Sequence, residues 1–165
     1  RFNNQIKEIE TGKFKGANKK VNIKLSKEKI IQIKKLYDRL RNQINPKVTW
    51  DANDIKPDNL RLRKGKVYLV DIEAISPRIK GFGIGKAFTK WFKTLSERND
   101  FLKGYKSISP INFLTEKYID FVLLNFLVQE LNYSYKYGKK FKPRPSVRKN
   151  ELNNLLSKYK SFIQY

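Results

Sequence analysis

Residues 53–73 read NDIKPDNLRLRKGKVYLVDIE, and their pattern carries most of the structural information in this chain. Leucine and arginine alternate over residues 60–63, and a second apolar run follows a glycine at residues 67–70. Such alternation on both sides of a glycine is typical of a β-hairpin with a tight turn. The hairpin is therefore expected to join two polar segments, residues 53–59 and 71–73.

Amphipathic helices are predicted on both sides of this region. Ser26 is a typical N-cap, and apolar residues recur at helical spacing over residues 27–44, before Pro46. Four helical stretches follow the hairpin, of which the third is apolar nearly all round and is expected to be a buried central helix. They lie at residues 84–95, 101–105 (a short helical or irregular piece), 115–135 and 152–163.

The remaining stretches are expected to be loops. They are residues 1–25, apart from a short strand at 21–25, and residues 47–59, 74–83 and 135–149. We therefore expect a mainly α chain with a small β-hairpin (α+β class). Its divisions would be a basic lead-in or linker at 1–25 and one lobe at 26–165, made of a helix at 26–45, loops and hairpin at 47–73, and a helical subdomain at 84–165.

Composition excludes several kinds of chemistry. The 165 residues include no Cys and no His, so thiolate nucleophiles, disulfides and imidazole acid–base catalysis are ruled out. Any catalysis must use carboxylates, amides, amines, hydroxyls and a hard metal such as Mg²⁺. The absence of Met suggests a piece of a longer protein, and no signal peptide or membrane span is recognisable, so we expect a cytoplasmic chain without a membrane partner.

Charge is strongly positive, with 37 Lys and Arg against 15 Asp and Glu, a net charge of +22. Such a balance favours contact with polyanions, although many lysines are expected to be ordinary surface residues. One third of the acids, five of 15, lie within residues 51–73. Acids retained in so basic a chain mark the place where chemistry is expected.

The acids and amides of this region have a specific spacing. Asp54 and Asn59 fit the pattern D-x-x-x-x-N, the loop ends in I-K-P-D-N, and Asp71 follows the hairpin in V-D-I-E. This order of helix, Asp/Asn loop, hairpin and Asp resembles the C-terminal, catalytic lobe of the protein-kinase-like superfamily. The V-D-I-E ending is closer to small-molecule kinases of the aminoglycoside-phosphotransferase type than to the D-F-G of protein kinases.

The resemblance implies an ATP-dependent phosphotransferase that acts on a hydroxyl-bearing acceptor. Asp54 would be the catalytic base, and Lys56 would place a positive charge near the transferring phosphoryl group. Asn59 and Asp71 would hold Mg²⁺ (or Mn²⁺), which prefers oxygen ligands, and Glu73 would support the metal site or a substrate loop.

This chain departs from the family pattern in three ways. Ala52 stands where the family has His, and Asn53 stands where protein kinases have Arg. No A-P-E follows. The Gly-rich phosphate loop and the strand lysine would have to come in cis from a lobe encoded before Arg1, so we expect no efficient turnover from these residues alone.

Alternative interpretations remain open. The Asp/Asn loop could be an Asx-turn beside a hairpin, and the chain could be a pseudokinase or a non-catalytic nucleic-acid-binding module. For RNA or another polyanion, the candidate contacts lie in a region where tyrosines alternate with basic residues: Lys136, Lys139, Lys140 and Arg144. Trp91, Phe88 and Phe92 are expected in a core, and Glu116 and Glu130 are expected to be surface or capping groups.

Overall fold

The computed structural model describes residues 1–17, 21, 25–52, 60–70, 75–92, 94–108, 113–138 and 145–163. The chain divides into two compact units, one formed by residues 1–45 and 113–165 and the other by residues 46–112. The described part contains seven helices and two two-stranded antiparallel sheets, so the expected mainly α class with a small β component is confirmed.

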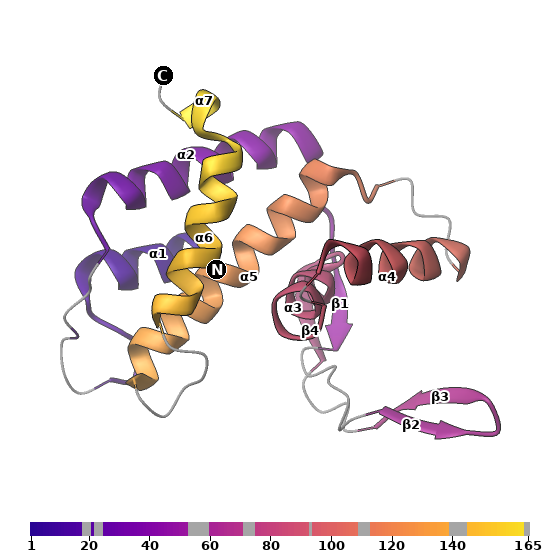
Figure 1. Ribbon diagram of the computed structural model, residues 1–165. Helices are drawn as coiled ribbons and strands as arrows, with labels where there is room; N and C mark the ends of the chain where they lie inside the picture. The colour runs from indigo at the N-terminus through magenta and orange to yellow at the C-terminus, as the bar shows by residue number, and fades with distance from the viewer. Residues whose placement is uncertain are drawn as a thin grey trace. The chain divides into compact units, whose positions relative to one another are not determined.

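The first unit is helical. Its central element is α5 (Glu116–Tyr137), which confirms the buried helix predicted at residues 115–135. Three helices pack against α5, as Figure 1 shows: α1 (Phe2–Thr11), α2 (Lys27–Ile44) and α6 (Pro145–Lys158). The short helix α7 (Lys160–Ile163) follows and contacts α2.

Helix α2 has the bounds that its sequence predicts. The Ser26 Oγ accepts a hydrogen bond from the backbone N–H of Lys29, at 3.2 Å. The helix ends at Ile44, and its C-cap Asn45, directly before Pro46, has a φ of 43°, which is the left-handed conformation. Leu36 and Leu40 are fully buried on the face that packs in the core.

Helix α1 was not predicted, because residues 1–25 looked like a loop. Phe2, Ile6 and Ile9 have helical spacing, and all three are buried against the rest of the unit. Gly12 then ends the helix with a φ of 67°, which a glycine adopts without strain. The stripe is short, and the residues that follow it up to residue 25 are polar and basic with little periodicity, so the sequence pattern did not predict the helix.

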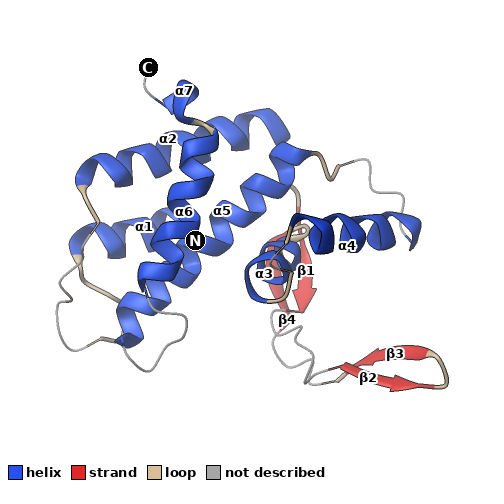
Figure 2. Ribbon diagram, in the orientation of Figure 1, coloured by secondary structure: helices blue, strands red, loops and turns tan. Residues whose placement is uncertain are grey.

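The second unit contains both sheets and two helices. Strand β1 (Val48–Ala52) pairs antiparallel with β4 (Ile75–Ile79), and β2 (Leu60–Arg63) pairs antiparallel with β3 (Lys66–Leu69), as Figure 2 shows. The helices are α3 (Phe82–Lys90) and α4 (Leu95–Ile108).

The predicted hairpin is confirmed as β2–β3. Arg63 is paired with Lys66, so Lys64 and Gly65 form a two-residue turn. Their φ values are 49° and 70°. Positive φ at both turn positions is the conformation that follows the twist of the strands, and it explains the glycine.

Three other predictions need correction. Strands β1 and β4 lie where loops were expected at residues 47–59 and 74–83. Strand β4 was not predicted because it contains Pro77. Both strands of a two-stranded sheet are edge strands, and edge strands tolerate proline. Helix α6 begins at Pro145, inside the expected basic loop, because proline suits the first position of a helix.

An aromatic cluster joins α3 to α4. Phe88 is buried, whereas Trp91 and Phe92 are half-buried, so the expected core position holds fully for Phe88 alone. The ring of Phe101 on α4 lies 4.9 Å from that of Phe92, centre to centre. Helix α4 begins before the short piece predicted at residues 101–105, and in this earlier part the Arg98 guanidinium donates hydrogen bonds to the backbone carbonyl oxygens of Phe88 and Phe92.

Candidate functional site

The five residues predicted to form a phosphotransferase site fall on two segments. Asp54, Lys56 and Asn59 belong to residues 53–59, and Asp71 and Glu73 belong to residues 71–74. Both segments lie outside the described residues. The structure describes the strands on either side of each segment: β1 and β2 flank the first segment, and β3 and β4 flank the second.

The strand register fixes the ends of both segments. Ala52, directly before the first segment, is paired with Ile75, directly after the second. Leu60, directly after the first segment, is paired with Leu69, shortly before the second. Paired Cα atoms in an antiparallel ladder lie about 4.5–5.5 Å apart. The first segment therefore connects Ala52 to Leu60, and the second lies between Leu69 and Ile75. Each connects one residue of the pair Ala52–Ile75 to one residue of the pair Leu60–Leu69.

Chain length limits how far apart these two pairs can be. Six residue steps separate Leu69 from Ile75, and a fully extended chain of that length spans about 22 Å at most. Asn59 lies one residue before Leu60, and Asp71 lies two residues after its partner Leu69. The β2–β3 ladder thus fixes Leu60 and Leu69, the paired residues from which the chain continues toward the predicted metal ligands Asn59 and Asp71.

By residue type, the predicted ligands Asn59 and Asp71 suit a hard cation. A carboxylate and an amide oxygen are ligands that Mg²⁺ accepts, and the remaining positions of its octahedron can be filled by water and phosphate oxygens. Within the described ranges, no group of three or more acidic residues is placed to hold a metal ion. The predicted ligands Asn59 and Asp71 lie outside these ranges.

The predicted polyanion contacts are only partly described. Lys136 lies near the end of α5, with its Nζ 5.1 Å from the centre of the Tyr137 ring. Lys139, Lys140 and Arg144 lie outside the described residues. The structure thus places Lys136 beside an aromatic ring, a contact that an ordinary surface lysine also makes.

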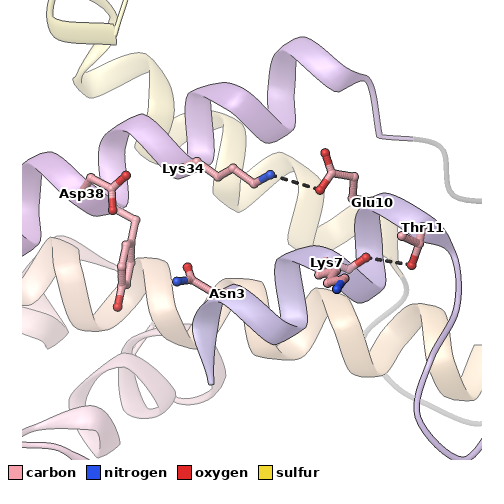
Figure 3. A pocket seen from close by; sticks show the side chains of 7 residues that line it. Asn3, Lys7, Glu10, Thr11, Lys34 and Asp38 are labelled. Carbon is pink, nitrogen blue, oxygen red and sulfur yellow. Dashed lines mark hydrogen bonds and ion pairs between the residues drawn. The ribbon is translucent and has the colours of Figure 1, made fainter.

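A groove of about 480 Å³ lies between α1 and α2 in the helical unit (Figure 3). Its charged groups have both signs, and the Lys34 Nζ lies 3.1 Å from the Glu10 Oε2. Seven side chains line it: Asn3, Lys7, Glu10, Thr11, Lys34, Tyr37 and Asp38. Because both partners of this ion pair are about half exposed, it is not a strongly desolvated pair of the kind that marks a catalytic centre.

Asp120 is the centre of a polar cluster in the helical core that the sequence did not reveal. Its Oδ2 accepts hydrogen bonds from the Lys158 Nζ at 2.5 Å and the Tyr159 hydroxyl at 2.6 Å. Burial, and then the bond to Asp120, raises the pKa of Tyr159. Burial alone would lower the pKa of Lys158, but its bonds to Asp120 and Glu116 raise it. The cluster fastens the end of α6 to α5.

Glu130 forms the second buried ion cluster, which corrects the prediction of a surface or capping role. Its Oε2 lies 3.3 Å from a terminal nitrogen of Arg148, and both side chains are at most 5% exposed. Arg148 also pairs with Glu151, one turn further along α6. Glu116, in contrast, is a surface residue in the first turn of α5, as predicted, and its bond to Lys158 lowers its pKa.

No protein-family model, curated protein or solved structure matches this chain. In the described part, no helix is long and apolar enough to cross a membrane.

Proposed function

We propose that residues 53–73 carry the catalytic residues of a protein-kinase-like phosphotransferase, which transfers the γ-phosphoryl group of ATP to a hydroxyl acceptor. The observation that supports this most is the strand register. The pairs Ala52–Ile75 and Leu60–Leu69 bracket both acidic segments, so a fold built from distant residues can assemble one site.

Each residue has a role in this proposal. Asp54 accepts the proton of the attacking hydroxyl, and Lys56 supplies positive charge near the phosphoryl group. Asn59 and Asp71 hold Mg²⁺, which would neutralise charge on the phosphates, and Glu73 supports Asp71 or a substrate loop. V-D-I-E favours a small hydroxyl compound as the acceptor over a protein.

The described elements occur in the order that the resemblance requires. Helix α2 precedes the first segment, the hairpin separates the two segments, and the helices α3 to α6 follow. The nucleotide-clamping lobe is expected from residues encoded before Arg1. Ala52 in place of the family His removes one side-chain anchor of the loop, so we expect slow turnover even when that lobe is present.

The decisive experiment measures ATP binding by calorimetry with and without Mn²⁺, on the chain together with any residues its gene encodes before Arg1. Binding should require the metal and should weaken at least about 10-fold in Asp71→Asn, since even indirect supporters of a metal site contribute that much. Asp100→Asn is the matched control, because it removes the same charge from an exposed position on α4.

A second variant separates an enzyme from a pseudokinase. Asp54→Asn should leave metal-dependent ATP binding intact and abolish the slow hydrolysis of ATP, because Asp54 acts on the nucleophile and not on the metal. ATP binding that ignores both Mn²⁺ and Asp71→Asn would contradict the proposal and indicate a generic anion site. Metal-dependent binding without any hydrolysis would indicate a pseudokinase.

A further inference from the structure

The hairpin β2–β3 carries a run of basic residues that the proposed phosphotransfer does not use. Residues 60–70 contain no acid and four basic residues: Arg61, Arg63, Lys64 and Lys66. The helices α1, α2, α4, α5 and α6 each contain acids among their basic residues. The positive charges of the hairpin therefore have no acidic residue among them, unlike those of most of the helices.

The register gathers these residues on one face. Arg61 is paired with Tyr68, and Arg63 is paired with Lys66. Residues paired directly across an antiparallel ladder lie on the same face of the sheet, and residues two apart on one strand share that face about 6.6 Å apart. The result is a patch of Arg61, Arg63, Lys66 and Tyr68, continued by Lys64 in the turn, which we call the basic ribbon.

The basic ribbon is accessible. Its four basic side chains are exposed, and Tyr68 is 48% exposed. Among the residues that the structure describes, none forms an ion pair with Arg63, Lys64 or Lys66. Of the described helices and strands, each strand of the hairpin packs extensively only on the other. An anion can approach Arg63, Lys64 and Lys66 without displacing a described ion pair.

We infer that the basic ribbon is a binding surface for single-stranded nucleic acid. Guanidinium and ammonium groups meet the phosphates of a strand, and an exposed aromatic ring between them offers a platform on which a base can stack. The basic ribbon supplies both. Tyr68 is paired with Arg61, and the next pair on the same face is Arg63 with Lys66.

The same observations fit an anionic membrane less well. A membrane-surface element carries its aromatic and large aliphatic side chains on the face opposite the basic ones, and that apolar face enters the lipid boundary. Leu62 lies on the opposite face of the hairpin, as such an element requires. The exposed aromatic ring of Tyr68, however, lies on the basic face, where it can stack on a base but would be held away from the lipid.

The experiment follows the fluorescence anisotropy of a labelled 12-nucleotide RNA of mixed sequence, titrated with the full chain at several salt concentrations. The test variant is R63Q/K64N/K66Q. Asn before Gly is the preferred pair for this turn, so the variant removes three charges without weakening the hairpin. The matched control, R41Q/K103Q/K106Q, removes one Arg and two Lys from exposed positions on α2 and α4.

We expect the test variant to bind about 10-fold more weakly near 100 mM salt and the control to change much less. The slope of log K against log salt should become shallower by about 2, because each lost phosphate contact contributes about 0.7 for a single strand. Tyr68→Leu keeps every charge and should weaken RNA binding roughly 5-fold or more while leaving the binding of inorganic polyphosphate unchanged.

Three results would overturn the inference. Equal losses in the test variant and the control would mean that diffuse charge, not the ribbon, attracts the RNA. No effect of Tyr68→Leu would mean that the surface does not read bases. Vesicles of phosphatidylserine that bind through the ribbon, when RNA does not, would assign it to a membrane. The assay uses neither ATP nor metal, so its outcome is independent of the proposed phosphotransfer.

Discussion

The helical unit and the β-containing unit differ in how many of their described apolar side chains are buried. In the first, α5 is surrounded by three helices, and Phe121, Leu124 and Leu131 are fully buried. In the second, the buried apolar residues among those described are Ile84, Ala87 and Phe88.

The strands of the second unit expose much of their apolar surface, with Val48 at 70%, Trp50 at 72% and Leu62 at 76% exposed. Local stability follows the number of buried apolar contacts, so we expect the helical unit to be the stable support and the unit with residues 53–73 to open more easily. Binding and catalytic segments are commonly found in the less stable part of a protein.

The strongest test of this difference compares one large side chain from each unit. Phe121 is fully buried, with its ring 5.3 Å from that of Tyr37 on α2, centre to centre. Phe121→Ala should lower the free energy of unfolding by about 4 kcal/mol, because it removes apolar contacts and leaves a cavity. Trp50→Ala should change it by less than about 0.5 kcal/mol, since an exposed side chain loses little.

Urea unfolding followed by far-UV circular dichroism measures both variants, because the signal comes mainly from the helices. If Trp50→Ala cost as much as Phe121→Ala, the exposed face of β1 would be buried in solution, and the contrast between the two units would be wrong. A loss confined to Phe121→Ala would place the main stability of the chain around α5.

The second test uses pH and concerns the helical unit alone. Burial, and then its bond to Asp120, raises the pKa of Tyr159 above its usual value of 10.0. The unfolded tyrosine releases its proton near pH 10 while the folded one keeps it, so the stability present below about pH 10 is lost as the pH rises through the folded pKa. One such group contributes at most about 1.4 kcal/mol per pH unit to this loss.

Tyr159→Phe removes this titration and should make the fall in the urea midpoint above about pH 10 shallower than in the native chain. Lys158, whose pKa is also raised, remains in both proteins and keeps part of the slope. Identical slopes would show that the phenol of Tyr159 is not held by Asp120. At neutral pH the variant loses the buried hydrogen bond from the Tyr159 hydroxyl to Asp120, so the midpoint measured there calibrates the comparison.

Local patterns predicted some elements well. Helix α2 was predicted from signals inside or next to the helix itself, namely the Ser26 cap, the apolar stripe and Pro46, and the hairpin was predicted from its own turn at Gly65. Helix α1 was missed because its apolar stripe is short. The strands β1 and β4 were missed because each is a strand only through its pairing with a partner about 27 residues away.

The buried charges could not be predicted for a related reason. Asp120 finds Lys158 and Tyr159, and Glu130 finds Arg148, only after α6 has packed on α5. An acid inside an apolar helix signals that a partner must exist, but not which one. The candidate site was defined by spacing in the sequence, and the structure adds the register of the strands that enter and leave its two segments.

The smallest predicted effect tests whether the hairpin is energetically separate from the helical core. Gly65 has a φ of 70°, and a Cβ added there would meet no atom within 4 Å, so Gly65→Ala is penalised by backbone strain alone, about 1 kcal/mol. Hydrogen exchange of the β2 and β3 amides should accelerate roughly 5-fold, while the urea midpoint of the helices stays unchanged. Gly104→Ala, also in open space but inside α4, should instead stabilise its helix slightly. Faster exchange in α5 after Gly65→Ala would mean that the hairpin and the helical core unfold together, since strain in a separate ribbon has no other way to reach that helix.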